Sequence, residues 1–289
     1  MLQQTSYGQT SPYLRGFTGY ETLCLIDGVR LNNSVFRSGP NQYWNTVDPL
    51  SIERYELVLG PGSVLYGSDA VGGVLNALPP TTPTWAGAPE SHAHLYYRGA
   101  SAEQSHIGRA SGTTRPTERV GLGAGVSVKT FGDLKGGHDV GEQSHTGYDE
   151  NDLDARLDYA LSPAADLSLV HQSVRQEDVW RTHRTVYGLN WKGLSRGTDK
   201  VHSYDQARDL TYGRLSLSPE GCVFDNAQWT VSRHDQTEDL YRVKRDDKSD
   251  RQGFDVETWG SSLQFESLTA CGAWLVGADY THDTVDSHL

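Results

Sequence analysis

Most of the chain follows a two-residue period, and this pattern limits what it can fold into. In residues 120–129 apolar side chains alternate with glycine, serine and lysine, and in 152–161 they alternate mostly with charged residues. Such alternation gives a β-strand one apolar face and one polar or small face. Weaker patterns of the same kind occur at 91–99, 105–112, 166–177, 208–218, 225–237, 254–266 and 273–282. The sequence therefore predicts about nine strands after residue 90.

One candidate strand breaks its own alternation. Within 208–218 the apolar positions shift from Leu210 and Tyr212 to Leu215 and Leu217. A single extra residue in a strand produces such a shift, so the pattern predicts either a β-bulge here or no regular strand.

The connections between these strands differ in length in a regular way. Short connections are expected at 113–119, 162–165, 219–224 and 267–272, whereas long, polar ones are expected at 131–151, 178–207 and 238–253. Short turns at one end and long loops at the other are typical of bacterial outer-membrane β-barrels. A soluble β-sandwich or barrel also has alternating strands, and the pattern alone leaves both fold classes open.

Residues 1–80 have a different organisation. Short apolar segments predict strands at 22–27, 55–59 and 73–78, and Asp48-Pro49 predicts the start of a short helix that reaches about Arg54. Residues 63–66 can form one helical turn. We interpret residues 1–80 as a small α+β domain, 81–90 as a Pro/Thr/Gly-rich linker and 91–289 as an antiparallel β domain.

Charge and composition exclude several classes of protein. The formal net charge of -12 argues against a nucleic-acid partner, since a phosphate backbone needs a basic surface. The sequence has no apolar run long enough for a transmembrane helix, and residues 1–16 lack the features of a signal peptide. Cys24, Cys222 and Cys271 form no CxxC motif, and Cys24 is expected to be a buried core thiol.

A glycine-rich stretch, GPGSVLYGSDAVGGVLN, occupies residues 60–76. It fails both common phosphate-binding patterns: no lysine follows Gly67 as a P-loop requires, and Leu65 stands where GxGxxG needs its third glycine. The glycines are therefore expected to serve tight turns and close backbone packing rather than nucleotide binding.

Four motifs of the first 80 residues resemble the plug domain of TonB-dependent outer-membrane receptors. They are LRGF at 14–17, LIDGVRLNN at 25–33, DPLSIER at 48–54 and the glycine-rich stretch 60–76. They occur in the order and at the spacing of that family and cover about residues 11–78. On this resemblance a structural motif of the plug is carried by Arg15, Gly16, Asp27, Gly28, Gly60, Gly67, Asp69, Gly72 and Gly73.

The resemblance implies an architecture and partners. The plug is a small mixed sheet lodged inside a barrel of about 22 strands in the outer membrane, of which this chain would supply about nine. The chain is then expected to be an interior piece, truncated at both ends, because an open sheet in lipid would leave unpaired edges costing tens of kcal/mol. An inner-membrane TonB-type energy-coupling complex would act through a plug segment that is missing here. The family carries ferric siderophores, haem, cobalamin and some glycans, and the sequence does not identify which.

The resemblance also implies a substrate-binding loop. In the family, the segment corresponding to residues 34–46 faces outward, and here Arg37, Asn41, Gln42, Tyr43 and Trp44 offer a cation, amides and aromatic rings. Such a mixture suits an anionic, partly planar small molecule or metal chelate. The alternative is that Phe36 and Trp44 only anchor the loop against the barrel. The loop has no histidine, and Pro40 stands about where some haem receptors carry their iron ligand.

The sequence contains no pattern that indicates a bound metal, a cofactor or a catalytic site. His92 and His94 share one strand face without an identifiable third ligand, while His138, His145, His183 and His202 lie in long loops. Asp27 is expected either to pair with Arg15 or Arg54 or to be an ordinary turn charge. No GxSxG or HExxH motif occurs, so we predict no enzyme and no cofactor. The alternative function is a soluble or surface-attached glycan-binding module that uses Trp180, Trp191 and Trp259.

Overall fold

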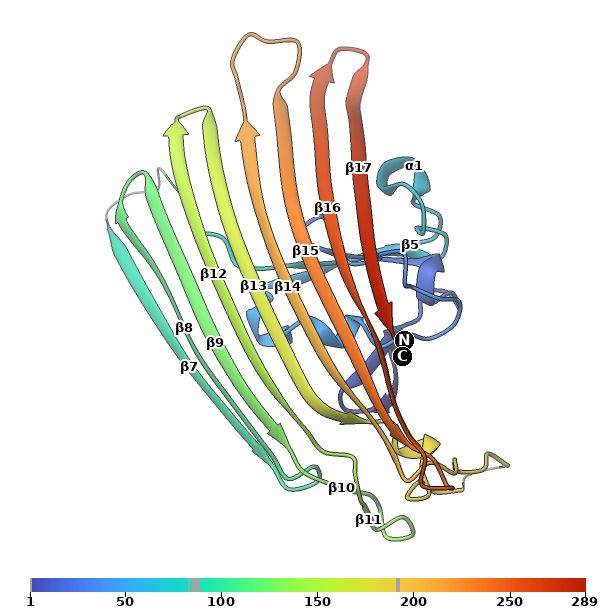
Figure 1. Ribbon diagram of the computed structural model, residues 1–289. Coiled ribbons are helices and arrows are strands. Elements are labelled where there is room, and N and C mark those ends of the chain that lie inside the picture. Colours follow the sequence, from blue (N-terminus) through green and yellow to red (C-terminus); the bar gives the residue numbers. More distant parts are fainter. Residues whose placement is uncertain (1, 83, 85–88, 191–192) are drawn as a thin grey trace.

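The computed structural model describes residues 2–82, 84, 89–190 and 193–289. Nine long antiparallel strands form one curved sheet, which we call the wall (Figure 1). Along the wall the order is β17-β16-β15-β14-β13-β12-β9-β8-β7. The strands are β7 (Glu90–Ala100), β8 (Ser105–Thr117), β9 (Val120–Phe131), β12 (Tyr148–Ser162), β13 (Ala165–Trp180), β14 (Val201–Leu217), β15 (Asn226–Val243), β16 (Ser249–Thr269) and β17 (Gly272–His288).

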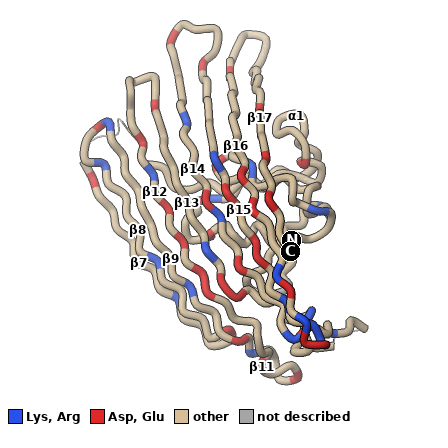
Figure 2. The backbone as a smooth tube through the Cα atoms, in the orientation of Figure 1, with Lys and Arg blue, Asp and Glu red and all other residues tan. Residues whose placement is uncertain are grey.

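All nine predicted strands are therefore present, in one sheet rather than in the two packed sheets of a sandwich. The connections 118–119, 163–164, 218–225 and 270–271 lie at one end, which we call the short-turn end. Residues 132–147, 181–190 and 193–200 lie at the opposite, long-connection end, where β10 (Leu134–Lys135), β11 (Glu142–Gln143) and η4 (Thr182–Arg184) interrupt them. Figure 2 shows that charged residues gather toward this end.

The third long connection was predicted wrongly. Instead of spanning 238–253 it spans only 244–248, because β15 and β16 continue in register from Asn226–Glu266 to Val243–Ser249. Arg242 forms an ion pair with Asp250 across these strand ends at 2.9 Å. Charged residues occupy both faces there, so the apolar alternation that marks a strand is lost although the strand continues.

The shift of apolar positions in β14 has a different cause from the one predicted. Pairing with β15 runs without interruption from Val201 to Leu217, so β14 contains no bulge in that ladder. Leu210 and Tyr212 are buried on the concave face, under the N-terminal residues, whereas Leu215 and Leu217 occupy the opposite face. The apolar set changes face because each face has its own apolar neighbour, which on the convex side is lipid in an outer-membrane barrel.

Residues 2–78, which we call the N-terminal unit, lie against the concave face of the wall (Figure 1). A four-stranded sheet has the order β4-β3-β6-β5, with β3 and β6 parallel. The elements are β1 (Leu2–Ser6), β2 (Gln9–Pro12), η1 (Gly19–Glu21), β3 (Thr22–Ile26), β4 (Val29–Arg30), η2 (Trp44–Thr46), η3 (Pro49–Ser51), β5 (Arg54–Leu59), α1 (Ser63–Tyr66) and β6 (Gly73–Leu78).

Two local predictions in this unit have clear outcomes. The helix expected from Asp48 to about Arg54 is only the 3-10 turn η3, and β5 already begins at Arg54. Asp48 does cap this turn, since its carboxylate accepts a hydrogen bond from the Leu50 N–H at 2.9 Å. β6 ends at Leu78, and β7 begins at Glu90, the last residue of the proposed linker 81–90. Residues 83 and 85–88 of this segment lie outside the described residues.

An apolar core joins the N-terminal unit to the wall. Ile26, Leu31 and Trp44 pack in one buried cluster with Leu210 and Tyr212 of β14. The expected core thiol, Cys24, belongs to this cluster, and burial raises its pKa to about 12. Among the described residues, no helix is both long and apolar enough to span a bilayer.

Candidate functional site

The loop between β4 and η3 points toward the long-connection end, and its predicted ligand residues differ in exposure. Only Arg37 is exposed, whereas Asn41, Gln42, Tyr43 and Trp44 are buried. Trp44 packs in the apolar core, and the Tyr43 ring lies 4.8 Å from Phe36 and 6.1 Å from Phe254. Burial raises the pKa of the Tyr43 phenol, which therefore stays protonated. Four of the five predicted ligand residues are therefore buried in the packing of the loop, and Arg37 alone faces solvent.

Arg37 lines a cavity of about 980 Å³ between the loop and the wall. Further cationic and imidazole groups of the lining come from the wall and from the connection 181–200: Arg181, Arg184, Arg242, His183 and His202. Among the described residues that line this cavity, Glu238 has the one acidic side chain. We call this cavity the arginine pocket. Its guanidinium groups can bind carboxylates, phosphates or catecholates through paired N–H donors.

Gln42 holds charged side chains of this pocket in place. Its amide oxygen accepts hydrogen bonds from Arg181 at 2.6 Å and from Arg37 at 3.4 Å, while its amide nitrogen donates to Glu238. Glu238 also accepts a hydrogen bond from Gln206 at 2.6 Å. One amide group thus holds two of the arginine side chains that line the pocket.

His183 follows β13 in the chain and lines the arginine pocket. Partial burial and then the neighbouring Arg181, Arg184 and His202 lower its pKa below the ordinary value. The side chain is therefore mainly neutral at neutral pH, and an anion in the pocket would favour its protonated form.

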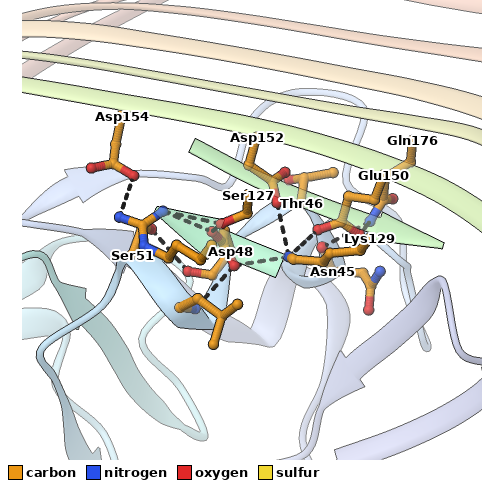
Figure 3. A network of polar contacts seen from close by, with 12 residues as sticks. Asn45, Thr46, Asp48, Ser51, Ser127, Lys129, Glu150, Asp152, Asp154 and Gln176 are labelled. Carbon is orange, nitrogen blue, oxygen red and sulfur yellow. Dashed lines mark hydrogen bonds and ion pairs between the residues drawn. The ribbon is translucent and has the colours of Figure 1, made fainter. Parts of the chain in front are cut away.

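A second polar region lies deeper, where η3 meets the wall (Figure 3). The Asp48 carboxylate contacts Lys129 at 2.8 Å, Ser127 at 2.7 Å and Arg109 at 3.4 Å. Lys129 also contacts Glu150 at 2.5 Å and Asp152 at 2.8 Å, and all of these charged groups are buried. We call this set the Asp48 network. It joins the N-terminal unit to β8, β9 and β12.

Asp27 forms another connection to the wall, contrary to its predicted partners. Its carboxylate contacts Arg214 at 2.9 Å and Arg156 at 3.8 Å, and it accepts a hydrogen bond from the Tyr212 hydroxyl. Arg54, one predicted partner, instead forms an exposed pair with Glu56 at 3.3 Å. Asp27 is buried, so the alternative of an ordinary surface charge is wrong as well.

Most of the predicted structural motif residues have an unusual backbone conformation. A positive φ occurs at Arg15, Gly16, Asp27, Gly28, Gly60, Gly67, Asp69 and Gly73. At Gly72 the constraint is space, since a Cβ there would lie 2.4 Å from the Phe17 Cβ. Asp69 pairs with Arg30 at 2.5 Å within the N-terminal unit. These geometries are those expected if the residues hold turns and close packing.

The remaining predicted candidates lie apart from these sites. His92 is exposed and lies 3.5 Å from Glu90, and among the described residues no three His, Cys, Asp or Glu side chains form a group suited to a metal ion. Trp180 stacks on His145 at 4.3 Å, Trp259 lies on the convex face near Arg233, and Trp191 falls outside the described residues.

The wall residues of the arginine pocket and of the Asp48 network were not predicted from the sequence. Arg109 and Lys129 occupy concave-face positions of β8 and β9, in strands whose other face is largely apolar or small. In β12 the available signal was a charge at every second residue from Glu150 to Asp158, because such charges need polar partners inside the barrel.

Comparison with known proteins agrees with this architecture. The family model for the TonB-dependent receptor plug domain matches residues 2–74. The vitamin B12 transporter BtuB of Photobacterium profundum is 26% identical over 91% of this chain. An iron-regulated outer membrane virulence protein of Vibrio cholerae is 31% identical over 65% of it. The chain spans 38% of the first relative and 29% of the second.

Solved structures show the same fold. A variant of the ferric enterobactin receptor PfeA of Pseudomonas aeruginosa superposes with a TM-score of 0.70 and 16% identity, over 99% of this chain and 45% of its own. The fold of this chain, an N-terminal unit set against one curved antiparallel wall, is thus shared with that structure. The chain therefore belongs to the TonB-dependent outer-membrane receptors and contains their plug domain with nine adjoining strands of the barrel.

Proposed function

We propose that this protein serves the energised uptake of an anionic small molecule or metal chelate across the outer membrane. The observation that carries the proposal is the arginine pocket, in which four guanidinium groups from both parts of the chain line one cavity. In an outer-membrane barrel the long-connection end faces the outside, so this pocket would be the first binding site for an arriving ligand.

The names of the similar proteins indicate which classes of ligand to compare. Their names describe a vitamin B12 transporter, an iron-regulated outer membrane protein and a ferric enterobactin receptor. Among such ligands a negatively charged iron chelate matches the charge of the pocket better than cobalamin does. In this proposal residues 1–80 are the stopper, 81–90 the linker and 91–289 part of the barrel, and a TonB-type complex drives release.

Replacing Arg37 by Gln should weaken binding of an anionic chelate about 10- to 100-fold, since one charge-assisted contact is lost. Binding of a ferric catecholate complex to the protein in detergent, followed by quenching of tryptophan fluorescence, measures this effect. A neutral ferric hydroxamate complex serves as the uncharged comparison and should bind more weakly to the unaltered protein.

The matched control is Arg233→Gln. Arg233 lies on the convex face and pairs with Glu257 at 2.8 Å, so its replacement should leave binding unchanged. Equal affinity for the charged and neutral complexes, or equal losses in both variants, would argue against the arginine pocket as the binding site.

Binding should also tighten as pH falls below neutral. The pKa of His183 is lowered in the free protein, and a bound anion would raise it, so the complex holds more protons than the free protein between the two values. Each unit of difference corresponds to about a tenfold change in affinity. Titrations of the ferric catecholate at a series of pH values test this, and His183→Gln should flatten the dependence. A dependence retained in that variant would assign it to another group, such as Glu238 or His202.

A further inference from the structure

We propose that a small cavity beside the arginine pocket binds a neutral carbonyl group of the ligand and thereby selects among anionic chelates. The cavity has a volume of about 100 Å³ and is lined by the hairpin of β1 and β2, the loop between β4 and η3, and the connection after β13. We call it the amide pocket, because its lining includes the uncharged side chains of Gln3, Gln9, Ser11, Asn41 and Gln42. The inference rests on the proposed function and specifies which anionic ligands the protein would accept.

The amide pocket adjoins the arginine pocket. Arg181 and His183 line both, so a ligand whose anionic part lies in the arginine pocket can extend a side group into the amide pocket. The Arg181 Nε–H donates to the Gln9 amide oxygen at 3.0 Å, and its Nη2 group donates to the Gln42 amide oxygen at 2.6 Å. The Nη1 group of Arg181 lies outside these two contacts and can donate to an anion.

Asn41 supplies the observation that points to a ligand group in the amide pocket. The residue is 6% exposed, and among the described residues its Nδ2 amide nitrogen has no hydrogen-bond partner. Its backbone is held, because the Asn41 N–H donates to the Ser11 hydroxyl oxygen at 3.2 Å, and that oxygen lies 3.0 Å from the Thr18 hydroxyl. Buried N–H groups normally have partners, since an unmade hydrogen bond costs free energy. The Asn41 amide is therefore available to an acceptor oxygen that enters the pocket.

The size of the amide pocket limits what can enter it. A volume of about 100 Å³ corresponds to roughly three water molecules, whereas a cavity that holds benzene has about 150 Å³. A carboxamide group therefore fits, and an aromatic ring does not. Water can also accept a hydrogen bond from Asn41, so a ligand group gains affinity only if it reproduces that bond.

The two pockets together match one class of ligand. The arginine pocket suits the anionic oxygens of a chelate, and the amide pocket suits an amide carbonyl attached beside them. A catecholate ring with an adjacent carboxamide has this arrangement, whereas an unsubstituted catecholate has only the anionic oxygens. A site built to hydrogen-bond a ligand group discriminates against the analogue that lacks the group. The amide-bearing chelate should bind about tenfold more tightly, which is the effect of one hydrogen bond.

The test compares two ferric complexes of equal charge. They are the tris complexes of catechol and of the catechol that carries a carboxamide ortho to one hydroxyl, used with excess ligand at alkaline pH so that both stay fully formed. Binding to the protein in detergent is followed by quenching of tryptophan fluorescence. The unaltered protein should prefer the carboxamide complex about tenfold. Asn41→Leu should make the two affinities nearly equal and leave that of the unsubstituted complex unchanged.

The matched control is Asn33→Leu. Asn33 lies in the same loop, and in the described part of the chain its Nδ2 nitrogen also has no hydrogen-bond partner, but it is not one of the residues that line either pocket. Its replacement should keep the preference for the carboxamide complex. Arg37→Gln should weaken both complexes by the same factor and likewise keep the preference.

Equal affinity of the unaltered protein for the two complexes would overturn the inference, because water alone would then occupy the amide pocket. A weakening of both by Arg37→Gln would still support the arginine pocket in that case. A preference that persists in Asn41→Leu would also overturn the inference, since another donor would then bind the carbonyl. If neither complex binds, the proposed function fails and this inference fails with it. Should Asn41→Leu not assemble, Asn41→Ala removes the same donor without adding a bulky apolar group.

Discussion

Lys129→Met is expected to lower the free energy of unfolding by about 3–5 kcal/mol, the range for removing one partner of a buried ion pair. The ammonium group of Lys129 contacts Asp48, Glu150 and Asp152, and the side chains of all three carboxylates are at most 3% exposed. Methionine preserves much of the side-chain length but leaves three buried acids without this cation. Urea unfolding in detergent, followed by tryptophan fluorescence, measures the loss.

The matched control is Lys200→Met at the long-connection end. Lys200 pairs with Asp247, and the two side chains are 43% and 76% exposed, so solvent already screens the interaction. Its replacement should change stability by less than about 1 kcal/mol. Similar losses in the two variants would contradict the role assigned to the Asp48 network.

Gly73→Ala is expected to cost about 2–5 kcal/mol, from backbone strain and overpacking together. Gly73 begins β6 with a φ of 154°, and a Cβ there would lie 2.4 Å from the Val58 carbonyl oxygen and 2.9 Å from a Leu14 methyl carbon. The carbonyl belongs to the paired strand β5 and cannot move without disturbing that ladder. Thermal unfolding of the detergent-solubilised protein provides the measurement.

Gly108→Ala in β8 tests whether the effect is specific. No atom lies within 4 Å of a Cβ built at Gly108, so the substitution should leave the melting temperature nearly unchanged. A Gly73→Ala protein as stable as Gly108→Ala would show that the start of β6 tolerates a side chain.

The strands of the wall were predictable because each has one face whose neighbours are uniformly apolar. That signal is strong at Val120–Val128, where every second side chain belongs to the apolar face, and it fades beyond Glu238, where charged residues stand on both faces. The helix at Asp48 was overestimated because a cap and a proline define where a helix starts but not how far tertiary contacts allow it to run.

The sites were predictable only on the side of the N-terminal unit. Gln42 and Asp48 belong to local motifs, whereas their partners Arg181 and Lys129 are distant in sequence and are brought close by the register of the wall. Asp27 shows the limit clearly: its local pattern suggested a neighbouring arginine, but Arg214 is 187 residues further along the chain. No rule for the spacing of residues within a sequence motif predicts a contact between residues so far apart in the chain.

The polar character of the joint between the N-terminal unit and the wall has a mechanical consequence. Besides their apolar contacts, the two parts meet through Asp27, Gln42 and Asp48 with their charged or hydrogen-bonding partners. Groups of this kind regain hydration as soon as they are pulled apart, which returns much of the free energy spent in separating them. Hydration can thus lower the free energy needed to move the N-terminal unit along the wall. A unit that is bound firmly at rest can then still slide under an applied force and later bind again in the same position.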